Sequence, residues 1–251
     1  MHGAPVAKTP SDRGPAPAPR RSGTPTSSSQ PDIKAFLEKA RTLHSSVEAG
    51  HRGRLLFALD ATMSRQPTWD AACQLQADMF QEAGKIGGLD IQLAYYRGFN
   101  ECRASRWVSD SRHLADLMTK IDCRGGHTQI GKILAHARAE AEKGSVQALV
   151  FVGDAMEEAI DDLAVLAGEL GLRGVPAFMF QEGHDPAVEQ AFREIARLSR
   201  GAYCRFDVGA AHQLAELLRA VAVYAAGGIK ALADLSSRQG RGTLKLLEQL
   251  K

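Results

Sequence analysis

Three features that assign a protein class quickly are missing from this 251-residue chain. No apolar run approaches the roughly 20 residues that a membrane-spanning helix needs, so we expect no contact with a membrane. The four cysteines, Cys73, Cys102, Cys123 and Cys204, are scattered without a CxxC pair, which argues against a zinc site and a disulfide framework. The first 30 residues lack the apolar stretch of a secretory signal, so we expect a cytoplasmic protein.

The chain also has no large excess of positive or negative charge. The chain has 31 lysines and arginines against 29 aspartates and glutamates, a formal net charge of +2. Residues 1–30 carry four basic residues and one acidic residue, which leaves 27 basic and 28 acidic residues elsewhere. A folded nucleic-acid binder would carry a basic face, and this near-neutral body argues against that class.

Composition divides the chain into four parts. Residues 1–30 are rich in proline, serine, threonine and glycine, and too poor in large apolar side chains to fold, so a disordered arm is expected. Residues 31–53 form an N-terminal helix and lead-in, because apolar residues recur at helical spacing after Asp32. Residues 54–226 form one domain, and residues 227–251 form a C-terminal helical tail.

Apolar strands alternate with helical patterns through residues 54–226. Continuous apolar strands separated by helices indicate an α/β fold, with a Rossmann-like, doubly wound, mostly parallel sheet and helices on both faces. The predicted strands are 54–60, 89–99, 102–108, 147–154, 175–183 and 201–207. The predicted helices are 67–83, 109–121, one after Thr128, 157–170, 186–199 and one through Val223.

Oxygen-bearing side chains gather where three segments of this pattern meet the edge of the sheet. Asp60 ends the first strand and is followed by Thr62 and Ser64, Thr128 lies in "GGHT", and Asp154 ends the strand "QALVFVGD". Ligands of such sheets bind at the carboxyl ends of the strands. Hydroxyls mixed with carboxylates, with no His or Cys pair nearby, suit Mg²⁺, Mn²⁺ or Ca²⁺ rather than zinc.

The ordered set of motifs resembles the metal-ion-dependent adhesion site of von Willebrand factor type A domains. That signature is DxSxS, then a threonine in a glycine-rich loop, then an aspartate; here Asp60, Thr62 and Ser64 form DxTxS, and Thr128 and Asp154 follow. The resemblance implies that the hydroxyls bind the cation directly and the aspartates bind it directly or through water. It further implies a protein-binding module, not an enzyme, whose partner supplies a Glu or Asp to the metal. Bacterial cytoplasmic relatives of the fold are linked to ATPase or chaperone-like assemblies.

Three other interpretations stay open. In a haloacid-dehalogenase-like phosphotransferase, Asp60 would be the nucleophile, Lys132 or Lys143 would neutralise the phosphoryl group, and Asp154 with Glu158 would hold Mg²⁺. Such enzymes usually have a second aspartate where this chain has Thr62. A metal-independent scaffold would keep the fold without the cation, and each polar residue could also be a turn or helix cap. Glu157 and Glu158 are interpreted as first-turn residues of their own helix.

Overall fold

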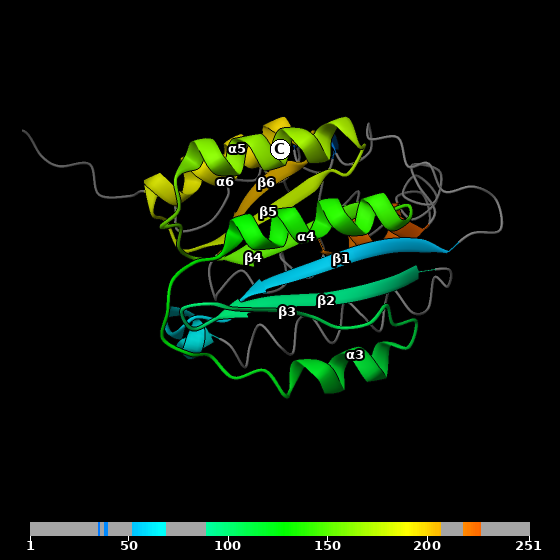
Figure 1. Ribbon diagram of the computed structural model, residues 1–251, viewed down its shortest axis with the longest axis horizontal. Helices are drawn as coiled ribbons and strands as arrows, with labels where there is room; N and C mark the ends of the chain where they lie inside the picture. Colours follow the sequence, from blue (N-terminus) through cyan, green and yellow to red (C-terminus); the bar gives the residue numbers. More distant parts are fainter. Residues whose placement is uncertain (1–34, 36–37, 40–51, 69–88, 207–217, 227–251) are drawn as a thin grey trace, which may run out of the picture.

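The polypeptide forms a six-stranded sheet covered by helices on both faces, as Figure 1 shows for the computed structural model, which describes residues 35, 38–39, 52–68, 89–206 and 218–226. The strands are β1 (Gly53–Asp60), β2 (Leu89–Arg97), β3 (Glu101–Ala104), β4 (Ala148–Gly153), β5 (Ala177–Glu182) and β6 (Ala202–Phe206). Their order in the sheet is β3-β2-β1-β4-β5-β6, and every neighbouring pair is parallel except β2 and β3. The predicted fold class is confirmed.

Helices lie on both faces of this sheet. They are the 3₁₀ helix η1 (Met63–Thr68) and the α-helices α3 (Ser111–Met118), α4 (Ile130–Lys143), α5 (Ile160–Leu172) and α6 (Pro186–Leu198). Residues 218–226 are also helical. Helices α4, α5 and α6 pack on one face, whereas α3 and residues 218–226 contribute to the core on the other. Figure 1 shows α3 on the side of the sheet opposite these three helices.

Strand β1 shows why the sheet is buried on both faces. Leu55, Phe57 and Leu59 join the core beneath α3, while Leu56 and Ala58 join the core beneath α4 to α6. Alternate side chains of a strand point to opposite faces, so a strand with helices on both sides is apolar throughout. Full burial of each large aliphatic or aromatic side chain contributes about 1.5–3 kcal/mol.

Several predicted boundaries were wrong. The second strand ends at Arg97 instead of residue 99, because Gly98 takes a φ of +61° and turns the chain towards β3. The hairpin strand predicted over 102–108 is the shorter β3, with Val108 forming only an isolated bridge to Ile91. Helix α5 begins at Ile160 instead of residue 157.

Several predicted segments lie outside the described residues. They include the arm at 1–30, most of 31–53, most of the helix predicted at 67–83, and the tail at 227–251. Pro67 itself lies in η1. Within the described parts of the chain, no helix has the length and apolar character needed to cross a membrane.

Candidate metal centre

Asp60, the last residue of β1, is fully buried at the carboxyl edge of the sheet. Its Oδ1 accepts a hydrogen bond from the Thr62 backbone amide at 2.7 Å, and its Oδ2 accepts one from the Tyr96 hydroxyl at 2.9 Å. The first bond is the turn-capping contact that an aspartate makes two residues onward. Tyr96, interpreted from the sequence only as a strand residue, fixes the carboxylate from the neighbouring strand. A buried tyrosine hydroxyl needs a partner, and that need is the signal that could have revealed the contact.

The two hydroxyls of the DxTxS motif face each other. The Thr62 Oγ1 lies 3.0 Å from the Ser64 Oγ, so the predicted convergence of these side chains is present. Thr62 is buried and Ser64 is exposed, which places the pair across the boundary between the sheet edge and solvent. The first motif therefore offers two oxygens at one point that solvent reaches.

Thr128 is fixed by a reciprocal pair of hydrogen bonds with Glu157. The Glu157 backbone amide donates to the Thr128 Oγ1 at 2.9 Å, and the Thr128 amide donates to the Glu157 Oε2 at 3.0 Å. Both carboxylate oxygens of Glu158 accept backbone amides of Ile130 and Gly131 at the start of α4. Our interpretation of these glutamates as first-turn residues of their own helix was wrong. They lie before α5 and satisfy amides of the loop and first turn of α4, where negative charge is favourable.

Asp154 directly follows β4, the strand next to β1. Its Oδ1 is buried and has no hydrogen-bond partner among the described residues. A Cβ built on the preceding Gly153 would lie 3.3 Å from the Asp60 Cβ, which shows how closely the two strand ends approach. A buried carboxylate oxygen without a donor is costly unless a cation or water satisfies it.

The three motif-bearing segments touch one another in pairs. The Arg124 amide donates to the Ala61 carbonyl at 3.0 Å, and Thr62 forms a parallel bridge with Arg124. The two hydrogen bonds between Thr128 and Glu157 connect the Thr128 loop to the segment after β4. Gly153, at the end of β4, lies close to Asp60 in the first motif. The structure therefore brings all three predicted segments to one edge of the sheet.

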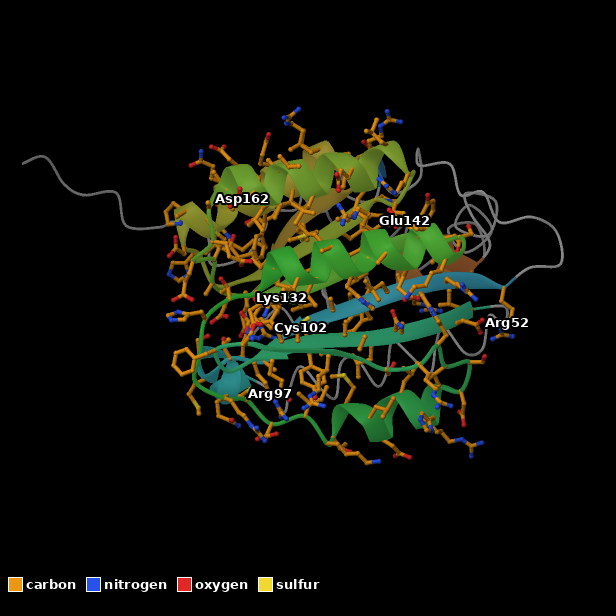
Figure 2. All side chains as sticks on the ribbon, in the orientation of Figure 1. Arg52, Arg97, Cys102, Lys132, Glu142 and Asp162 are labelled. Carbon is orange, nitrogen blue, oxygen red and sulfur yellow. The ribbon has the colours of Figure 1, made fainter. Side chains whose placement is uncertain are left out.

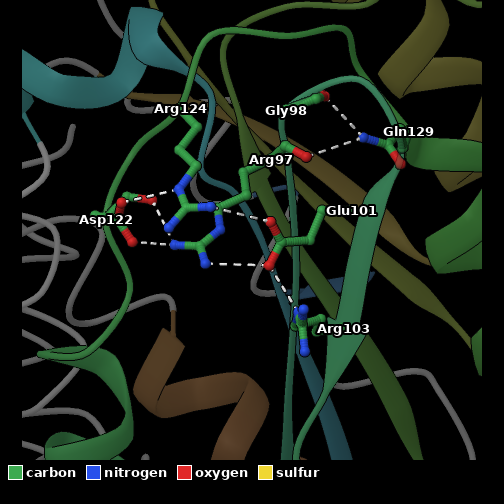
Figure 3. Close-up of polar contacts among 7 residues, drawn as sticks. All are labelled: Arg97, Gly98, Glu101, Arg103, Asp122, Arg124 and Gln129. Atoms are coloured by element: carbon green, nitrogen blue, oxygen red, sulfur yellow. Dashed lines mark hydrogen bonds and ion pairs between the residues drawn. The ribbon is translucent and has the colours of Figure 1, made fainter.

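A polar network, drawn in Figure 3, connects the turn between β2 and β3 to residues 122–129, the loop that contains Thr128. Arg97 pairs with Asp122 and with Glu101, and Glu101 also binds Arg103 and Arg124. At the end of this loop, the Gln129 Nε2 donates a hydrogen bond to the Gly98 carbonyl at 3.1 Å and a second one to the Arg97 carbonyl. Sequence reasoning missed this network because it joins residues 97–103 to residues 122–129, and the charged side chains in it belong to no motif.

Burial and negative charge shape the electrostatics of the centre. Burial raises the pKa of Asp60, and the nearby charge of Asp154 raises it further, while the bonds from Thr62 and Tyr96 act in the opposite direction. Burial also raises the pKa of the Tyr96 hydroxyl, with Asp60 adding to the effect. The ionised form of Asp60 is thus disfavoured here, and a nearby cation would stabilise it.

The two lysines of the phosphotransferase alternative pair with side chains other than Asp60. The Lys132 Nζ donates to the Gln129 Oε1 at 2.8 Å and also contacts Asn100, whereas Lys143 pairs with Glu140 at the opposite end of α4. Figure 2 shows Lys132 near Arg97 at one end of the sheet, while Arg52 lies at the other.

The donor chemistry fits a hard divalent cation. In the described parts of the chain, no group of three or more His, Cys, Asp or Glu side chains is arranged to hold a metal ion. A metal at this edge would therefore depend on hydroxyl oxygens together with the two aspartates. Those oxygens are present, and the Asp154 Oδ1 accepts no hydrogen bond from the residues that the structure describes.

The chain contains an α/β domain with the von Willebrand factor type A fold. Its six-stranded sheet has one antiparallel edge strand, helices on both faces and polar loops at the carboxyl edge. A von Willebrand factor type A protein from Catenulispora acidiphila is 16% identical, with a TM-score of 0.56 over 72% of this chain and 47% of that one. The D319A mutant of the PilB minor pilin from Streptococcus sanguinis is 8% identical, with a TM-score of 0.54 over 70% and 62% of the respective chains. The SpRpn10 VWA domain is 13% identical, with a TM-score of 0.53 over 68% and 94%.

These identities establish the fold alone. The chain spans less than two thirds of the length of the first two of these proteins. No family model and no curated protein matches the sequence.

Proposed function

We propose that this chain is a protein-binding module whose metal centre binds an acidic residue of a partner protein. Thr62, Ser64 and Thr128 would hold Mg²⁺ or Mn²⁺ through their hydroxyls, with Asp60 and Asp154 acting directly or through water. The cation would supply a positive charge to which a carboxylate binds. The module would bind its partner without catalysing a reaction.

The observation that carries this proposal is the buried Oδ1 of Asp154, which has no hydrogen-bond partner in the described part of the chain. It belongs to one of three touching segments that also present the facing hydroxyls of Thr62 and Ser64. A cation is the simplest group that satisfies a buried carboxylate oxygen and hydroxyl oxygens together.

Charge explains why the partner group should be acidic. The two carboxylates balance the charge of a divalent cation, and the three neutral hydroxyls add no negative charge. One further carboxylate can therefore still replace a water bound to the cation. A lysine or an apolar side chain offers no such ligand. The partner class we propose is a protein with an exposed Glu or Asp, in an ATPase or chaperone-like assembly of the cytoplasm.

Calorimetric titration with MnCl₂ tests the metal centre. The native chain should bind Mn²⁺, and the double variant Asp60→Asn with Asp154→Asn should not, while its circular dichroism spectrum is retained. Asp162→Asn is the matched control, because Asp162 is an exposed aspartate on α5 (Figure 2). Equal Mn²⁺ affinity in the double variant and the native chain would show that Asp60 and Asp154 do not form the metal centre.

Affinity capture tests the partner. Proteins retained on the immobilised chain in Mg²⁺ should be released by EDTA, and the double variant should not retain them. Replacing one acidic residue of the captured protein by its amide should abolish binding, because a few central contacts dominate most interfaces. A partner that binds equally in EDTA would favour the metal-independent scaffold.

A further inference from the structure

Arg65 is a fully buried arginine that directly follows the DxTxS motif. Its backbone amide donates to the Thr62 carbonyl at 3.1 Å, so it belongs to the same turn as the motif hydroxyls. Its Nη1 forms an ion pair with the Oε2 of Glu182, the last residue of β5. A charged side chain with no exposed surface requires such compensation.

The ion pair spans the end of the strand that carries Asp154. Strands β1 and β5 are not neighbours, because β4 lies between them. Gly153 is opposite Gln181 in the sheet register, so the next residues, Asp154 and Glu182, emerge side by side. A side chain that reaches from the turn after β1 to Glu182 therefore passes Asp154.

The charges of the centre act on Arg65 accordingly. Burial lowers the pKa of its guanidinium, while the negative charges of Asp154 and Asp60 oppose that effect. Among the described residues, the buried edge thus contains three carboxylates, those of Asp60, Asp154 and Glu182, and one guanidinium. Their formal sum is two negative charges, which matches a divalent cation.

We propose that the buried Arg65–Glu182 pair sets the affinity of the metal centre for divalent cations. This inference rests on the proposed function, because it requires that a cation binds at Asp60 and Asp154. Arg65 places a positive charge beside the carboxylates and lowers the affinity for the cation. Glu182 offsets that charge and keeps the centre competent to bind metal.

A purely structural ion pair would behave differently. Removing either member of a buried pair leaves the other uncompensated, so both single variants would loosen the centre and weaken metal binding. An electrostatic role predicts opposite signs, because one variant removes a positive charge and the other a negative charge. Charge interactions with a divalent ion in a partly buried site are large enough to change affinity about tenfold.

Calorimetric titration with MnCl₂ in low-salt buffer separates these cases. Arg65→Met should bind Mn²⁺ about tenfold more tightly than the native chain, and Glu182→Gln about tenfold more weakly. The double variant restores the formal sum and should return to within about threefold of native affinity. Arg138→Met and Glu169→Gln are the matched controls, because that ion pair links α4 to α5 away from the centre, and neither should change the affinity.

Each outcome decides between the two roles. Weaker binding in both single variants would overturn the proposal and assign the pair a structural role. If Arg65→Met does not fold, as judged by circular dichroism, Glu182→Gln is titrated with both MnCl₂ and TbCl₃. A larger loss of affinity for the trivalent ion supports the electrostatic role, because a charge effect grows with the charge of the ion, whereas equal losses, or unchanged or tighter binding, contradict the proposal. A native chain that binds no Mn²⁺ would instead overturn the proposed function, so the two failures are distinguishable.

Discussion

Gly126, in the loop that carries Thr128, packs directly against Gly98 in the turn between β2 and β3. A Cβ built on Gly126 would lie 2.0 Å from the Gly98 carbonyl oxygen, a distance that no real side chain adopts. The neighbouring His127 amide donates to the same carbonyl at 3.3 Å. The position of the Thr128 hydroxyl therefore depends on a glycine that permits close backbone contact.

Gly126→Ala should displace this loop. Overpacking of this kind costs about 1–3 kcal/mol, so the free energy of unfolding should fall by that amount in urea titrations, and Mn²⁺ affinity should fall with it. Gly125→Ala is the matched control, since a Cβ there meets nothing within 4 Å. Equal effects of the two substitutions would contradict the close contact.

Thr128→Ala should weaken metal binding much more than folding. It removes one of the proposed ligands, and Mn²⁺ affinity should fall about tenfold or more in calorimetry, the size of a lost charge-assisted contact. The Glu157 amide loses its acceptor, which should lower stability by about 1 kcal/mol. Thr119→Ala, at the exposed end of α3, should change neither quantity. Native affinity in Thr128→Ala would exclude Thr128 as a ligand.

The sequence could predict the fold and the position of the motifs because both depend on local patterns. Strand β1 is apolar throughout, and the carboxyl ends of parallel strands share one edge, so Asp60 and Asp154 had to approach each other. The hydroxyl pair of Thr62 and Ser64 followed from their spacing in one turn.

Contacts between distant parts of the chain could not be predicted in this way. Arg65 follows a motif in a polar turn, and nothing near it in the sequence indicates that its partner is Glu182, 117 residues away. Glu157 and Glu158 have the spacing of first-turn acids, but their carboxylates bind amides of the Thr128 loop and of α4 instead. Such roles depend on tertiary contacts, which local periodicity does not encode.

His136 should make the domain less stable in mild acid. Burial lowers its pKa, and its Nε2 lies 2.9 Å from the Gln92 Oε1 on β2. The unfolded chain takes up the proton at a pKa of about 6.5 and the folded chain only at lower pH, so stability is complete above that value and falls as the pH decreases through it.

Thermal unfolding between pH 7.5 and pH 5 checks this prediction. His136→Gln should flatten the dependence of the melting temperature on pH, because it removes the titrating group. His113→Gln, at an exposed position of α3, should leave the dependence unchanged. The same slope in all three chains would show that the pH dependence comes from other groups.

The chain should not transfer phosphoryl groups through Asp60. Attack by Asp60 needs an accessible carboxylate, yet this side chain is fully buried and both of its oxygens accept hydrogen bonds. Glu158, the second metal ligand of the phosphotransferase alternative, uses both oxygens to bind backbone amides at the start of α4. Purified protein with Mg²⁺ should therefore neither hydrolyse p-nitrophenyl phosphate nor bind beryllofluoride at Asp60. Turnover that requires Mg²⁺ would replace the binding module with an enzyme, and a beryllofluoride adduct on Asp60 would identify that carboxylate as the nucleophile.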